Sequence, residues 1–260
     1  MQKRIWITSL SKDKDTTEAL LQLGRKYGLA PDGHFWVDEV KKIAWQAPLD
    51  SLLAKETALW VIAGTKKDLE KDSVRYGLSL LCLSLQHTKG IGFPILFVCP
   101  DDSIRIEDLP TPFKGCDILK SDHPSLGAKL TARANTPVKI IPMDYRINIH
   151  ANPGYGIWYE IGPAKGLVWN GMLAGGLTAE VDAHGVGPKG ELPLKTTLEY
   201  PMQGLKLALG KDEYKAWAVK NKIDENLSYY VRFSDSPGSV LFGQLPDEDN
   251  EGEFHILHLS

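Results

Sequence analysis

The sequence lacks the cysteine patterns that identify many small binding and redox domains. Its 260 residues include only three cysteines, Cys82, Cys99 and Cys116, and no Cys-x-x-Cys pair. An odd number of cysteines without that spacing indicates neither a disulfide framework nor a zinc ribbon. Cys82 and Cys99 lie in apolar segments, where a free cysteine usually behaves as a small buried hydrophobe.

Long apolar runs and a surplus of positive charge are also missing. The longest apolar stretch, LSLLCLSL at 78–85, is far shorter than the roughly 18 residues that a membrane span requires. The basic N-terminus passes into a strand-like run without a small-residue cleavage site, which argues against a secretory signal. A formal net charge of −3 gives no electrostatic reason to expect nucleic acid as a partner. We therefore expect a cytoplasmic protein that binds neither membrane nor nucleic acid.

Two widespread catalytic and nucleotide-binding motifs are absent, and a third is missing at the position where its fold requires it. A P-loop requires Gly-x-x-x-x-Gly-Lys-Ser/Thr, whereas LWVIAGTKKDLEKDS at 59–73 contains a single glycine, Gly64. A dinucleotide-binding turn requires Gly-x-Gly-x-x-Gly, but SKDKD follows the first strand-like segment. No Gly-x-Ser-x-Gly elbow nominates a nucleophilic serine. The sequence therefore names no cofactor, and any catalytic residues stay unknown.

Strand-like and helical segments alternate through the first half of the chain. The strand-like segments are RIWITSL at 4–10, HFWVDEV at 34–40, TALWVIAG at 57–64, FPILFVCP at 93–100 and, more weakly, CDILKS at 116–121. Helical patterns fall between and after them, at 15–28, 48–56, 68–88 and 123–134. The segments 59–63 and 95–99 are apolar without alternation, as expected of strands covered by helices on both faces. We predict an open, mostly parallel α/β sheet with these two strands at its centre.

The pattern of the sequence changes after NTP at 135–137. Segments such as YRINIH at 145–150 and YGIWYEI at 155–161 alternate polar and apolar residues between glycines and prolines, which indicates antiparallel strands. YPMQGLKLALGKDEYKAWAVKNKI at 200–223 is predicted to interrupt them with two helices. Further strands close the chain, with an acidic loop at 246–253 between the last two. We therefore expect an α/β open-sheet domain at 1–135 and a mostly antiparallel, β-rich α+β domain at 136–260.

Small polar and charged residues gather at the predicted carboxyl ends of the parallel strands. Ligands of open α/β sheets bind outside these ends, near the switch in strand order. The ligand-binding residues expected there are Ser9, Ser11, Gly64, Thr65, Lys66 and Asp101. Thr65 and Asp68 have the spacing of a capping box, so we interpret the junction at Gly64 chiefly as a capped turn. An anion site at the same helix start is the alternative.

The order of segments in the first half resembles the TIR domains, which hydrolyse nucleotides or act as scaffolds, and equally the flavodoxin-type sheets. ALWVIAGT, the following helix start with serine and aromatic residues, and FPILFVCP carry this resemblance. The TIR pattern places a glutamate six residues after a serine on that helix, where it engages the ribose of a nicotinamide nucleotide. Counted from Ser73, this position is Ser79 here. The resemblance therefore implies a topology and not the carboxylate of the hydrolases.

One segment of the second half aligns residue types that bind metals. LTAEVDAH at 177–184 places Thr178, Glu180, Asp182 and His184 on one face of a predicted strand. Such a row suits a divalent cation or acid–base chemistry. It is also typical of any half-exposed antiparallel strand. We interpret the row as a solvated face and predict no metal site.

Because every catalytic motif tested is missing, we favour a non-catalytic ligand- or partner-binding module of regulatory type. One alternative is a small-molecule hydrolase or nucleotide-processing enzyme with its site at the same strand ends. Another is a structural subunit of a complex. A cleft with converging polar groups favours a ligand or an enzyme, whereas an exposed apolar patch favours an interaction protein. The expected partners are accordingly a small molecule or nucleotide, another protein, or a second copy of the chain.

Overall fold

The protein consists of two units, each with its own sheets. The computed structural model describes residues 2–246 and 253–260, and its contacts divide the chain into Met1–Ile141 and Pro142–Ser260. The boundary expected near residue 136 falls at the end of the last helix of the first unit. Most of the acidic loop expected at 246–253 lies outside the described residues. The first unit is an α/β structure and the second is antiparallel, as the sequence predicted.

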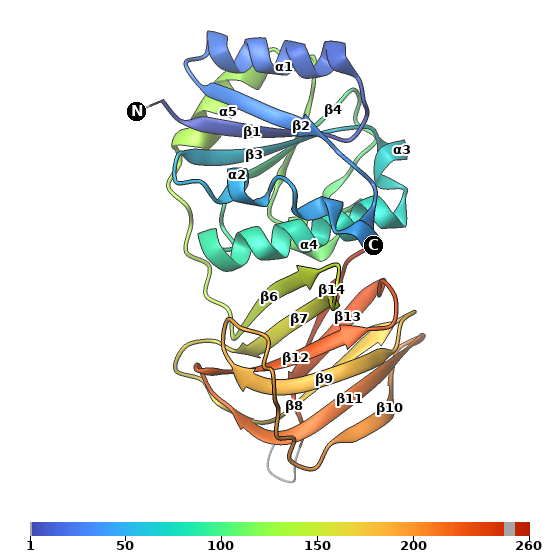
Figure 1. The fold of residues 1–260 in the computed structure, drawn as a ribbon. Coiled ribbons are helices and arrows are strands. Elements are labelled where there is room, and N and C mark those ends of the chain that lie inside the picture. Colours follow the sequence, from blue (N-terminus) through green and yellow to red (C-terminus); the bar gives the residue numbers. More distant parts are fainter. Residues whose placement is uncertain (1, 247–252) are drawn as a thin grey trace. The chain divides into compact units, whose positions relative to one another are not determined.

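The first unit is a five-stranded parallel sheet with helices on both faces. Its strands are hydrogen-bonded in the order β2-β1-β3-β4-β5, with β1 at Arg4–Ser9, β2 at Ala30–Phe35, β3 at Thr57–Ala63, β4 at Ile95–Cys99 and β5 at Asp117–Lys120. One face is covered by α1 (Lys14–Lys26) and α5 (Leu126–Asn135), and the other by α2 (Leu49–Leu53) and α4 (Asp72–Lys89), as Figure 1 shows. Shorter elements are α3 (Lys66–Leu69) and the 3-10 turns Val40–Lys42, Ala44–Gln46, Ile106–Asp108 and Thr111–Phe113.

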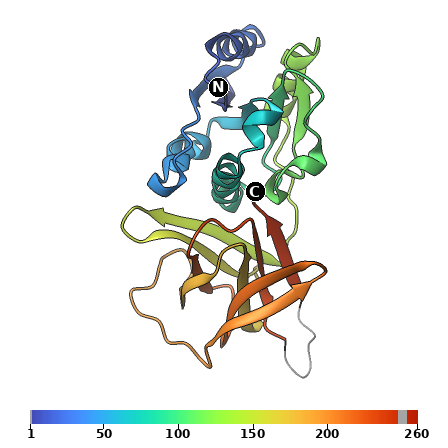
Figure 2. The same ribbon diagram turned by 90° about the vertical axis from the view of Figure 1, so that its right-hand side faces the viewer.

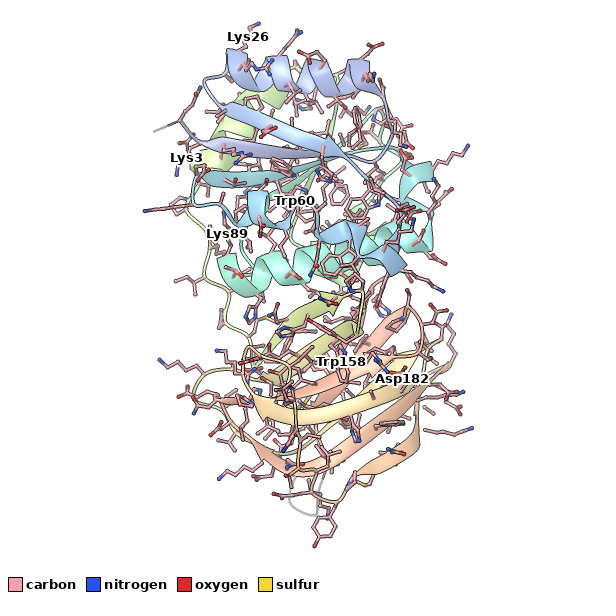
Figure 3. The ribbon with its side chains drawn as sticks, viewed as in Figure 1. Lys3, Lys26, Trp60, Lys89, Trp158 and Asp182 are labelled. Atoms are coloured by element: carbon pink, nitrogen blue, oxygen red, sulfur yellow. The ribbon has the colours of Figure 1, made fainter. Side chains whose placement is uncertain are left out.

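The two middle strands are buried on both faces, as their unbroken apolar sequences predicted. Every residue of β4 is buried, and so is every residue of β3 from position 59 onward. On one face, side chains of β1, β3 and β4 pack against Leu20 of α1 and Leu126 of α5. Trp60 alternates with these residues along β3 and points to the other face (Figure 3). There its Nε1 donates to the Thr8 hydroxyl at 2.8 Å, so that two buried polar groups satisfy each other.

The apolar helix segment around Cys82 belongs to this core. Positions 78–85 of α4 are all buried, and no helix in the described part of the chain is long and apolar enough to cross a membrane. Cys82 and Cys99 are free and buried, as their apolar surroundings predicted. Burial raises the pKa of both thiols. They therefore behave as small hydrophobic side chains.

The strand β2 begins four residues before the segment in which the sequence predicted it. The expected strand at 34–40 is replaced by Ala30–Phe35, which contains a proline and a glycine. The Ala30 amide donates to the Lys3 carbonyl just before β1, and the Trp36 amide donates to the Ser9 carbonyl at the end of β1. Because the direction of these bonds alternates along a strand, the backbone nitrogen of Pro31 faces the open edge of the sheet. Proline is tolerated there because an edge position does not need its N–H group.

The second unit consists of two antiparallel sheets. The first has the order β6-β7-β12-β9, with β6 at Tyr145–Asn152, β7 at Gly156–Pro163, β12 at Leu227–Phe233 and β9 at Val181–Pro188. The second has the order β10-β11-β8-β13-β14, with β10 at Met202–Leu209, β11 at Asp212–Ile223, β8 at Trp169–Leu177, β13 at Ser239–Gln244 and β14 at Phe254–His258. The rings of His184 in β9 and Trp217 in β11 meet edge to face, with centroids 4.8 Å apart. The two sheets therefore pack face to face.

The two helices predicted at 200–223 are wrong, because this segment forms the hairpin of β10 and β11 (Figure 2). The helical prediction relied on Tyr214, Trp217 and Ala218, at spacings of three and four residues. The spacing of four between Tyr214 and Ala218 also fits one face of a strand. In the strand Ala216 is buried between these two residues, and Trp217 points to the opposite face, where it meets His184. Gly210, expected to end a helix, lies in the hairpin turn with φ 62°, a left-handed conformation that suits glycine.

His34 on β2 is held neutral among aromatic rings. Its Nδ1 accepts a hydrogen bond from Trp6 Nε1 at 3.1 Å, and the two rings stack with centroids 5.8 Å apart. Burial lowers the pKa of His34 from 6.5 to about 4. The pKa of His34 is lower in the folded than in the unfolded protein, so the contribution of the neutral ring to the unfolding free energy is fully present above pH 6.5. That contribution is lost as the pH falls toward 4.

We predict that replacing His34 by glutamine flattens this part of the stability profile, because glutamine can accept from Trp6 but does not titrate. Between pH 7 and pH 4 the wild type should lose up to about 3 kcal/mol more unfolding free energy than His34→Gln. Urea unfolding of both proteins at several pH values in this range measures the difference. Parallel profiles would contradict a buried, neutral His34.

Candidate functional site

A small crevice opens where the strand order of the parallel sheet reverses. The strand β1 lies between β2 and β3, and sheets of this kind bind ligands at such a switch point. The crevice has a volume of about 80 Å³ and lies at the carboxyl ends of β1, β3 and β4. Four of the six predicted site residues line it, together with three further polar residues: Ser9, Ser11, Gly64 and Thr65, then Asp13, Thr16 and Ser121.

The other two predicted site residues, Lys66 and Asp101, do not line the crevice. Lys66 is exposed at the start of α3. The Asp101 carboxylate is also exposed and accepts from the Ser103 amide at 2.9 Å, which closes its own turn. Hydrogen bonding from Ser103 lowers the pKa of Asp101, and the charges of Lys120 and Lys66 add to this effect. Asp101 is therefore a charged surface residue near the crevice.

Carboxylates of the chain itself occupy both helix N-termini beside the crevice. Asp13 caps α1 by accepting from the amides of Asp15 and Thr16 at 3.0 and 3.2 Å. Thr65 and Asp68 form a capping box at α3. The Thr65 hydroxyl accepts from the Asp68 amide at 3.3 Å, and the Asp68 carboxylate accepts from the Thr65 amide at 2.9 Å. The capped turn predicted from the sequence is thus confirmed, and a phosphate at either helix start would meet a carboxylate.

Three hydroxyl groups around the crevice donate hydrogen bonds to other groups of the chain. The bonds run from Ser9 Oγ to the Ser11 carbonyl at 2.6 Å, from Thr16 Oγ1 to Asp13 at 2.6 Å, and from Thr65 Oγ1 to Asp68 at 2.7 Å. A hydroxyl that donates still offers oxygen lone pairs. The crevice therefore presents mainly acceptors and the charge of Asp13 to a ligand. Groups with N–H or O–H donors match it better than phosphate does.

The capping box allows a prediction that separates fold stability from ligand binding. Thr65→Ala removes the hydroxyl that accepts from the Asp68 amide and should cost about 0.5–2 kcal/mol of unfolding free energy. Lys66→Ala should change it by less than about 0.5 kcal/mol, because the side chain is exposed. Thermal and urea unfolding of both variants give the two values. Equal losses in the two variants would contradict the cap.

A second cluster of polar groups lies in the four-stranded sheet of the second unit. The side chain of Glu160 on β7 is 1% exposed. Its Oε2 lies 2.6 Å from His150 Nε2, and its Oε1 accepts from the Ser228 hydroxyl at 2.7 Å and the Gly190 amide at 2.8 Å. Arg146 on β6 lies 3.4 Å from Oε1. Burial alone would raise the pKa of Glu160, but these hydrogen bonds outweigh it and lower the pKa to about 2.

Arg146 is fixed by bonds to the start of β12 and to the connection that precedes it. Its Nη1 donates to the Ser228 hydroxyl at 2.6 Å, and its Nη2 donates to the carbonyls of Asp224, at 3.2 Å, and Leu227. Gly162 on the adjacent strand makes room for the guanidinium, since a Cβ there would lie 2.6 Å from Nη2. Burial lowers the pKa of Arg146, while the charge of Glu160 acts in the opposite direction. Its Nε is buried without a partner among the described residues.

The sequence contained one signal for this cluster. In YRINIH, the polar residues Arg146, Asn148 and His150 alternate with isoleucines, which predicts a strand with one polar face. The alternation does not show what this face contacts. Only the register of β6 and β7, which sets Asn148 opposite Glu160, brings the carboxylate between Arg146 and His150.

We predict that Glu160→Gln costs about 3–5 kcal/mol of unfolding free energy at pH 7, because it leaves the charge of Arg146 buried without its partner. The folded pKa of Glu160 lies below its usual 4.5, so its contribution is present above pH 4.5 and is lost as the pH falls toward 2. The difference in unfolding free energy between the variant and the wild type should therefore become smaller in acid. Urea unfolding at pH 7 and pH 3 measures it, and a gap that stays constant would contradict the charged carboxylate.

The row of potential metal ligands expected at 177–184 does not form. The strand β8 ends at Leu177 and β9 begins at Val181, with Thr178 between them at φ 70°. The three ligand types each have a different partner: Glu180 pairs with Lys215, Asp182 with Arg232 at 2.9 Å, and His184 Nδ1 with the Tyr229 hydroxyl at 2.8 Å. No three such groups converge on a metal position in the described residues. The Arg232 side chain that pairs with Asp182 also lies over the ring of Trp158, at 5.3 Å from its centroid; Figure 3 labels Trp158 and Asp182.

Comparison with known proteins gives no assignment for this chain. No family model matches the sequence, and no curated protein matches it either. Ser79, the position of the TIR glutamate, is completely buried in α4 and offers no group to a ligand. Function must therefore be inferred from the geometry of the two polar clusters.

Proposed function

We propose that the protein is a non-catalytic binding module of regulatory type, which holds a small ligand at the crevice between β1 and β3. The observation that carries the proposal is the acceptor-rich lining of this crevice at the switch point of the sheet. Three of its hydroxyl groups donate hydrogen bonds to acceptors within the chain, and the Asp13 carboxylate adds a negative charge. The ligand that fits this lining carries amino, amide or hydroxyl groups.

The size of the crevice limits what it can hold. A water molecule occupies roughly 30 Å³ of liquid, so a cavity of about 80 Å³ takes only a small group of atoms. The crevice therefore suits the polar head of a ligand, with the rest of the molecule outside. Nucleotides fit less well, because a phosphate has only acceptors to offer and would lie beside Asp13 and Asp68.

Binding is favoured over catalysis because the lining holds no activated nucleophile. The Cys99 thiol lies there, but it donates to the carbonyls of Asp101 and Leu119 at 3.1 and 3.5 Å. Burial raises the pKa of Cys99, and the nearby charges of Asp101 and Asp102 raise it further. A thiol that stays protonated does not act as a nucleophile.

We predict that small amines, amides or polyols raise the melting temperature of the protein, and that Ser121→Trp abolishes the rise. Ser121 lies exposed at the crevice and its hydroxyl has no partner in the described residues, so a large side chain there blocks the opening without breaking a bond. Ser125→Trp is the matched control, because Ser125 is exposed outside the lining. A ligand that binds only the folded state raises its stability.

Asp13→Asn distinguishes the class of ligand. Asparagine caps a helix as well as aspartate does, so the fold should keep its stability. A cationic ligand should lose affinity in this variant, whereas a neutral polyol should not. No rise with any such compound in the wild type, or an undiminished rise in Ser121→Trp, would overturn the proposal.

A further inference from the structure

A separate cavity of about 430 Å³ lies beside Arg146 in the second unit. It is formed by the segment after β7, the end of β9 and the turn before β12, and its lining residues are Arg146, Lys165, Pro188, Lys189, Glu225 and Asn226. Three of these residues are cations and one is a carboxylate. We propose that this cavity binds a small oxyanion, a phosphate or carboxylate group, with Lys165 and Lys189 as its ligands and the charge of Arg146 in its wall.

The two lysines are exposed. In the described part of the protein, neither Lys165 nor Lys189 forms an ion pair or a side-chain hydrogen bond. Other lysines of this unit do have partners, such as Lys215 with Glu180. Two unpaired ammonium groups at one cavity raise the local concentration of anions, because walls of low dielectric focus their field.

The guanidinium of Arg146 supplies a cation that is already in place. It is held by the Ser228 hydroxyl, by two carbonyls and by the space over Gly162. A side chain that is ordered before the ligand arrives loses little entropy on binding. Glu160 and Glu225 supply two negative charges against the three positive charges of Arg146, Lys165 and Lys189. The cavity therefore keeps a net positive charge.

The size of the cavity fits a small molecule. Sites for such ligands usually have volumes of roughly 300–1,000 Å³ with a few fixed polar groups. Glu225 and Asn226 add an acceptor and an amide at the rim, where they can bind a hydroxyl or amino group next to the oxyanion. This site is independent of the crevice in the first unit, since the two are lined by different residues and suit ligands of opposite character.

Isothermal titration calorimetry of the full chain with inorganic phosphate, and separately with malonate, tests the inference. The ionic strength is held constant with sodium chloride, because salt screens exposed charges. The variants are Lys165→Gln, Lys189→Gln and the double substitution. All three leave Arg146 and its partners untouched, so the fold should be unaffected. Lys195→Gln is the matched control, because Lys195 is exposed in the same unit outside the cavity.

We expect phosphate, malonate or both to bind the wild type and Lys195→Gln with the same affinity. Each single substitution should weaken binding several-fold, and the double substitution should weaken it by about tenfold or more, since each removes one charge-assisted bond. A response to phosphate alone would assign a phosphoryl ligand, and a response to malonate alone a carboxylate. The inference is overturned if neither anion binds, or if the double variant binds as well as Lys195→Gln does.

Discussion

The buried charge of Glu160 is the constraint on which the second unit depends. A carboxylate removed from water costs several kcal/mol unless hydrogen bonds and a positive charge surround it. Here the surrounding groups come from β6, β12 and the segment after β9, as Arg146, His150, Ser228 and the Gly190 amide. The need to satisfy one charge therefore fixes strands and connections that are far apart in the sequence. It also holds Arg146 at the edge of a cavity.

The two polar clusters of the protein are opposite in character. In the first unit, the chain donates its own hydroxyl protons and places carboxylates at two helix starts, so that the crevice accepts. In the second unit, the cavity is lined by an anchored arginine and by two lysines that have no side-chain partner in the described residues. Neither cluster exposes an activated nucleophile. The two proposed sites would therefore take ligands of opposite character, and a ligand bound at either site would stabilise the unit that holds it.

Capping explains why a junction that resembles a phosphate-binding turn need not bind phosphate. A helix N-terminus attracts anions because its first amides have no partners within the helix. In this protein Asp13 and the pair of Thr65 and Asp68 supply those partners from within the chain. The same groups that stabilise the helix starts thereby place carboxylates where a phosphate would otherwise meet free amides. The contacts that cap the helices therefore also set the charge of the crevice.

The sequence by itself determined the features that depend on neighbouring residues. The apolar runs of β3 and β4 predicted strands buried on both faces, and the spacing of Thr65 and Asp68 predicted the cap. Local patterns failed at the β10–β11 hairpin. There the four-residue spacing of Tyr214 and Ala218 fits one face of a helix and also one face of a strand. For the cluster around Glu160, the sequence predicted only the polar face of the strand YRINIH. The members of this cluster lie up to 82 residues apart, and only the strand register decides that they meet.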